Sequence, residues 1–121
     1  MSNRTTNPDF LNGVPELVAL ELLSRRPMYG YELVQAIQEQ SAGALAFGEG
    51  CIYPVLHKLE SRGDLASRRM EVGGRNRVVY RVTPKGAKQF RQSVAQWSAV
   101  VAAVGRILQG GKHEHQRIRS A

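Results

Sequence analysis

The sequence predicts a mainly α-helical fold with a two-stranded β-sheet near its middle and a long helix towards its C-terminal end. Three patterns support this fold class. Apolar residues recur at spacings of three and four in several short segments, as they do on one side of a helix. Two segments between residues 66 and 83 alternate apolar with polar residues, as strands do, around a turn that contains two glycines. Beyond residue 84 the helical spacing continues for about three heptads.

The composition indicates one small domain that favours a negatively charged partner. A chain of 121 residues is long enough for one domain and too short for two. Its formal net charge of +7 favours nucleic acid or an anionic membrane surface. The longest apolar run, Ala99 to Val104, is far shorter than the roughly 20 residues of a membrane-spanning helix. Because residues 1–10 also lack the apolar core of a signal peptide, we expect a cytoplasmic protein, and a single cysteine, Cys51, suits that reducing compartment.

The sequence carries no strong sign of catalysis or of a cofactor. It contains no Gly-rich phosphate loop, no nucleophile motif and no Cys/His set at the spacing of metal ligands. His113 and His115 flank Glu114, but adjacent ligands without a scaffold fix no metal geometry. A nuclease that uses His57 would need a carboxylate cluster for its metal, and none accompanies it. We therefore expect neither an enzyme nor a bound metal or cofactor.

Residue types at the ends of the apolar segments place the first two helices. Residues 1–12 are polar, show no sustained period and are expected to form a flexible arm. The first helix begins near Pro15, whose fixed φ suits an opening turn, and it ends before Pro27. The second helix covers about Gly30 to Gln40, with an apolar side towards the core.

The third helix is expected to have one apolar side and one side of small and polar residues. Its buried stripe consists of Ile52, Val55, Leu56 and Leu59. Its opposite side consists of Gly50, Pro54, His57 and Ser61, flanked by Tyr53 and Lys58. Gly50 is the expected cap, which places Pro54 within about the first turn, where proline is tolerated. Such a helix docks on a core with one side and offers the other side to a groove.

A β-hairpin and a long helix complete the expected order. The hairpin turns at Gly73-Gly74-Arg75-Asn76, which gives it a basic tip. Thr83 and Pro84 are the expected cap and first residue of the last helix, and Gly110-Gly111 is its expected end. The apolar positions of this helix form a coiled-coil pattern and predict dimerisation through Ala87, Phe90, Val94, Trp97, Val101, Val104 and Leu108.

This order is that of a winged helix-turn-helix, and it points to DNA. The third helix enters a major groove about 12 Å wide in this architecture. Gly50 and Pro54 permit close approach, whereas Tyr53, His57 and Lys58 reach phosphates or base edges. The expected contacts of the hairpin, to the backbone or a minor groove, come from Arg75, Asn76 and Arg77. The expected organisation is an arm (1–12), a DNA-binding domain (13–83), a dimerisation helix (84–109) and a flexible basic tail (110–121).

Three stretches resemble the PadR family of bacterial regulators. They are MYGYEL at residues 28–33, GCIYPVLHKLE at 50–60 and YRVTPKG at 80–86, in the order and at the separations of the family's motifs. The resemblance runs from about Val14 to Leu108 and is closest to the short subgroup, which has a single C-terminal helix.

The resemblance implies a homodimer that represses transcription and leaves its operator when a small molecule or another signal arrives. It also implies that Tyr31, Tyr53, Pro54 and Lys58 lie at the DNA surface together with the hairpin. Cys51, next to Gly50, is also expected on the DNA-binding side of the third helix. The family usually has Ser or Thr at this position, so a hydroxyl contact to phosphate is in doubt there. Cys51 is either a passive small residue or a redox-sensitive thiol at a helix start.

The dimer also suggests a ligand site. Relatives of the short subgroup enclose flat aromatic compounds between their paired last helices, so a planar aromatic inducer is a candidate partner. In this chain Phe90, Val94, Trp97 and Val101 would line such a site, although Trp97 is first of all a packing residue of the dimer. A different class of function, a winged-helix interaction subunit that does not read DNA, is the alternative; Lys58 and Arg62 on the third helix argue against it.

Overall fold

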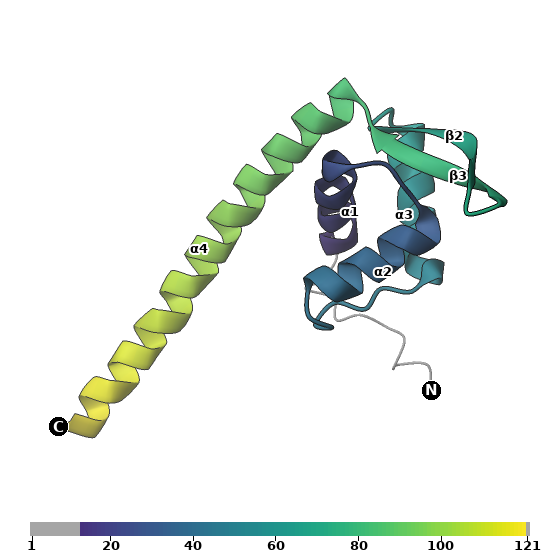
Figure 1. Ribbon diagram of the computed structural model, residues 1–121. Coiled ribbons are helices and arrows are strands. Elements are labelled where there is room, and N and C mark those ends of the chain that lie inside the picture. The colour runs from purple at the N-terminus through teal and green to yellow at the C-terminus, as the bar shows by residue number, and fades with distance from the viewer. Residues whose placement is uncertain (1–12, 121) are drawn as a thin grey trace. The chain divides into compact units, whose positions relative to one another are not determined.

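The computed structural model describes residues 13–120, and it describes side chains as far as residue 110. The elements are α1 (Val14–Arg25), β1 (Met28–Tyr29), α2 (Gly30–Gln40), α3 (Glu49–Ser61), β2 (Leu65–Val72), β3 (Arg75–Val82) and α4 (Pro84–Ser120) (Figure 1). This order confirms the predicted fold class. The chain divides into two units, one that ends at Phe90 and one that consists of α4 from Arg91 onward.

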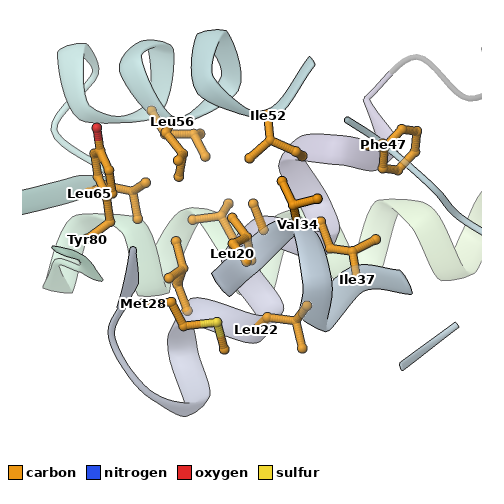
Figure 2. Close-up of a cluster of buried hydrophobic side chains, with 14 of the residues drawn as sticks. Leu20, Leu22, Met28, Val34, Ile37, Phe47, Ile52, Leu56, Leu65 and Tyr80 are labelled. Atoms are coloured by element: carbon orange, nitrogen blue, oxygen red, sulfur yellow. The ribbon is translucent and has the colours of Figure 1, made fainter. Parts of the chain in front are cut away.

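The core of the first unit lies between α1, α2, α3 and the sheet. Figure 2 shows Ile52 and Leu56 extending from α3 towards Leu20 of α1. Helix α3 buries Ile52, Leu56 and Leu59 completely, whereas Val55, the fourth residue of the predicted stripe, is half-buried. Phe47, in the loop between α2 and α3, is only 1% exposed, although the sequence pattern gave no helical or strand signal for it. Its burial holds a loop, rather than a helix, against the core.

The sheet has three antiparallel strands in the order β1-β3-β2, one more than predicted. Strand β1 was missed because its two residues are too few to show any alternation. The hairpin turn is also tighter than predicted, with only Gly73 and Gly74 at positive φ (+60° and +81°). Two central residues of positive φ are those of the type I′ turn, which matches the strand twist. Arg75 therefore pairs with Val72 inside the ladder, so it does not belong to the turn.

Helix α3 begins two residues earlier than predicted, and this moves its proline deeper into the helix. The N-cap is Gly48, so Gly50 is a residue of the first turn and is not the cap. Pro54 is then the sixth residue and has no N–H to donate to the carbonyl of Gly50. The prediction that Pro54 lies in the first turn is wrong, and the carbonyl of Gly50 is left as an acceptor on the outer side of α3.

Helix α4 starts where predicted and is fixed there by a close contact. The N–H of Gly86 donates to Oγ1 of Thr83 (3.0 Å), which donates in turn to the carbonyl of Gly63 (2.6 Å). Gly86 lies so close to the loop after α3 that a Cβ on it would be 2.0 Å from the carbonyl oxygen of Asp64. Only glycine fits this position without a shift of the backbone. Lys85 adds a hydrogen bond from its ammonium group to the carbonyl of Arg62.

The far end of α4 differs from the prediction. The helix was expected to close at Gly110, but it continues through both glycines to Ser120. A glycine inside a helix costs about 1 kcal/mol relative to alanine, which weakens a helix without ending it. The expected arm (1–12) lies outside the described residues, and so do the side chains of His113 and His115. None of the helices in the described part of the chain is long and apolar enough to cross a membrane.

Candidate nucleic-acid interface

Helix α3 turns one side to the core and leaves the other exposed. The exposed residues, here called the outer face of α3, are Gly50, Pro54, His57, Lys58 and Ser61. The sequence assigned all five of these residues to the side of the helix that faces the groove. It also assigned Cys51 and Tyr53 to that side, but the structure shows both to be half-buried. A face of small residues with one cation and one imidazole is compatible with close approach to a groove.

Tyr53 is a packing residue as well as a candidate contact. A Cβ built on Gly30 would be 2.5 Å from Cε1 of Tyr53, so the ring lies directly over the first residue of α2. The ring also packs against the core, and its centroid is 6.4 Å from that of His57. Tyr53 therefore holds the start of α2 against α3, and Gly30 leaves the space that its ring occupies.

Lys58 is held by a carboxylate from another helix. Its Nζ lies 2.8 Å from Oε2 of Glu16, in the first turn of α1. The same carboxylate lies 3.5 Å from Arg62, which also pairs with Asp64 at 2.9 Å. Asp64 is only 2% exposed, so this last pair is partly buried. Sequence reasoning missed Glu16, because nothing in the spacing of residues 16 and 58 indicates that they meet.

Cys51 is not an activated thiol in this structure. It lies half-buried in the first turn of α3, and burial raises the pKa of its thiol above the ordinary value. A thiolate is the reactive form, so a raised pKa lowers reactivity at neutral pH. Of the two readings left open by the sequence, the geometry favours the passive small residue.

The start of α2 offers a second candidate contact. Tyr31 is 47% exposed and lies in the first turn of α2, where the N–H groups of a helix attract anions. The N–H of Tyr29 donates to Oε1 of Glu32 (3.3 Å), and the other carboxylate oxygen of Glu32 lies 2.7 Å from Arg26. This chain of contacts fixes the turn between α1 and α2, directly before Tyr31.

The hairpin is richer in cations than predicted, and one of its arginines is not at the tip. Arg75 and Asn76 are exposed beside the turn. Arg77 is half-buried, with its guanidinium carbon 4.3 Å from the centre of the Tyr29 ring. Its Nε is buried and has no hydrogen-bond partner among the described residues. Further exposed arginines, not assigned from the sequence, stand at Arg68, Arg69 and Arg81.

Helix α4 carries an exposed apolar surface. The residues of this surface, here called the α4 stripe, are Val94, Trp97, Val100, Val101, Val104, Ile107 and Leu108. At 100° per residue they cover roughly 140° of the helix, which is wider than a simple coiled-coil seam. Val100 and Ile107 are additions to the predicted set. Ala87 and Phe90 are half-buried, and Phe90 packs against the core of the first unit.

Comparison with known proteins agrees with this arrangement. The profile of the PadR-like family of transcriptional regulators matches residues 19–92. The chain is 34% identical over 87 residues to the transcriptional regulator YqjI of Escherichia coli. That match covers 72% of this chain and 41% of YqjI, so this chain spans about two fifths of the length of that relative.

Solved structures extend the likeness to nearly the whole of some regulators. A transcriptional regulator from Clostridium thermocellum has a TM-score of 0.76 at 26% identity, over 84% of this chain and 96% of the other. A PadR-family transcriptional regulator from Eggerthella lenta has a TM-score of 0.73 at 32% identity, over 83% and 86%. The order of the helices, the hairpin and the long last helix is therefore shared with regulators of similar size.

Proposed function

Because the chain belongs to the PadR-like family of transcriptional regulators, we propose that it is a homodimeric repressor that binds a specific operator. The observation that carries the proposal is the outer face of α3, which exposes small and polar residues while Ile52, Leu56 and Leu59 on the opposite side are fully buried. A helix placed in this way is available to a major groove. Such a regulator acts on the chromosome, so the proposal places it in the cytoplasm.

The α4 stripe supports the dimer. Seven large apolar side chains on one helix are exposed in the single chain, with Ile107 at 74% and Trp97 at 44%. Contiguous apolar surface of this kind marks an interaction site in soluble proteins. Pairing with a second copy would cover it and would bring two α3 helices to half-sites about 34–36 Å apart.

DNA binding should depend on the cations of α3 and the hairpin. Lys58→Ala and Arg75→Ala are each expected to weaken binding to the DNA upstream of the protein's own gene. Each should also reduce the slope of log K against log salt by about one unit, because each removes one phosphate contact. Fluorescence anisotropy at several salt concentrations measures both quantities. Arg77→Ala is expected to weaken DNA binding in the same way. Because Arg77 stacks on Tyr29, the melting temperature of this variant is measured as well, to show that the fold persists.

The matched control is Lys88→Ala, which removes an exposed cation from the first turns of α4. It should change neither the affinity nor the slope. If Lys58→Ala and Arg75→Ala have the same DNA affinity and salt slope as Lys88→Ala, then the DNA-binding surface lies elsewhere on the protein. Absence of any specific complex would favour the alternative function, an interaction subunit that does not read DNA.

Release by a small molecule is the finer part of the proposal. Phe90, Val94, Trp97 and Val101, each present twice in a dimer, would line an aromatic and apolar site for a planar aromatic inducer. The exposure of Trp97 on the α4 stripe supports this idea. A planar dye such as proflavine is expected to quench the single tryptophan and to weaken the DNA complex. If dye binding, followed by the dye's own signal, is unchanged in Trp97→Ala, then Trp97 serves in packing alone.

A further inference from the structure

A pocket of about 400 Å³ lies on the side of the sheet that faces away from the core. The register shows which side this is. Tyr80 of β3 pairs with Met28 and is buried in the core, so its neighbour Val79 points to the opposite side. Val79 pairs with Tyr29 on one flank and with Arg68 on the other, and all three line the pocket. The hairpin and the turn before α2 thus enclose the pocket together.

The apolar part of the lining comes from both of these segments. Met70 and Val72 of β2 and Val79 of β3 supply aliphatic side chains, and Pro27 and Tyr29 supply rings. Val79 is only 8% exposed. A volume of this size lies within the range of small-molecule pockets, about 300–1,000 Å³.

The charged part of the lining has a surplus of cations. Its members are Arg26, Arg68, Arg81 and the carboxylate of Glu32. Glu32 is already paired with Arg26 at 2.7 Å. Within residues 13–110, neither Arg68 nor Arg81 has a carboxylate at ion-pair distance, and both are exposed. Two guanidinium groups therefore remain available to an anion beside an apolar surface.

We propose that this pocket binds a small amphipathic anion. Its carboxylate, phosphate or sulfonate group pairs with Arg68 and Arg81, since a guanidinium binds such groups through two parallel hydrogen bonds. Its apolar body lies on Met70, Val72 and Val79. The phosphate backbone of DNA would satisfy the arginines but would leave the apolar lining unused, whereas an amphipathic anion uses both. This site is separate from the α4 stripe, and the proposal does not depend on DNA binding.

Two probes with the same aromatic body test the proposal. One is 1-anilinonaphthalene-8-sulfonate, and the other is N-phenyl-1-naphthylamine, which lacks the sulfonate. Each is titrated into the full chain while the fluorescence of the dye is followed. The test variant is Arg68→Gln with Arg81→Gln, and both positions are exposed, so the fold should persist. The control is Arg69→Gln with Lys88→Gln, which removes the same charge from exposed positions outside the pocket lining.

The sulfonate probe is expected to bind the test variant at least about tenfold more weakly than the wild type, the scale of one charge-assisted hydrogen bond. The control variant should bind it as the wild type does, and the uncharged probe should not distinguish the three proteins. Equal binding of the sulfonate by test and control variants would overturn the proposal. The proposal would also be overturned if the Arg68→Gln, Arg81→Gln variant bound the sulfonate probe normally and only its salt slope of DNA binding fell. The two arginines would then be phosphate contacts.

Discussion

Gly86→Ala is expected to lower the free energy of unfolding by about 1–3 kcal/mol or more, the scale of overpacking in a tight site. The new Cβ would be 2.0 Å from the carbonyl oxygen of Asp64, a backbone atom that cannot rotate away. A shift of α4 to relieve this contact would stretch the hydrogen bonds of Thr83 with Gly86 and Gly63. Loss of a cap of this type costs about a further 1 kcal/mol. Urea unfolding at fixed protein concentration, followed by circular dichroism, measures the change.

The matched control for this prediction is Gly110→Ala in the same helix. Apart from the neighbouring backbone of the helix itself, no atom of the described residues lies within 4 Å of a Cβ built on Gly110, so alanine should fit without strain. Because alanine is the better helix former, this variant is expected to be neutral or more stable by up to about 1 kcal/mol. Similar stability of the two variants would mean that Asp64 and Gly86 are not in close contact in solution.

Val101→Asp with Val104→Asp is expected to dissociate the proposed homodimer. The two residues are each 49% exposed on the single chain and lie near the middle of the α4 stripe. The double variant places two carboxylates from each chain in the surface that the partner copy would cover. The free energy of association then loses several kcal/mol of apolar burial, at roughly 25 cal/mol per Å². It also desolvates charges that have no partner. Sedimentation velocity should show a dimer for the wild type and a monomer for the double variant.

Ala99→Asp with Ala102→Asp provides the control. These residues are exposed on α4 with the same spacing of three, and at 100° per residue they lie on the side opposite the α4 stripe. They add the same charge to the same helix, and the dimer should persist. If both double variants remain dimeric, the α4 stripe is not the dimer interface.

Several features of the candidate site were predictable because they depend on near neighbours in the chain. The stripe of Ile52, Leu56 and Leu59 follows from the helical period alone, and the exposed outer face of α3 follows from that stripe. Thr83 and Pro84 marked the start of α4 by their local backbone preferences. A pair of glycines marked the hairpin, although the type of turn came only from their φ angles.

The sequence by itself therefore determined the order of the elements, the two sides of α3 and the apolar stripe of α4, since each is set by residues within a few positions of one another. The tertiary structure alone decided what those elements bring together. The pairs Glu16 with Lys58, Tyr29 with Arg77 and Gly86 with Asp64 join residues 22 to 48 positions apart. Such contacts depend on how helices and strands pack, and no local periodicity records that packing. The same packing makes Tyr53 half-buried over Gly30 and leaves Arg68 and Arg81 beside an apolar pocket without an ion pair to any residue between 13 and 110.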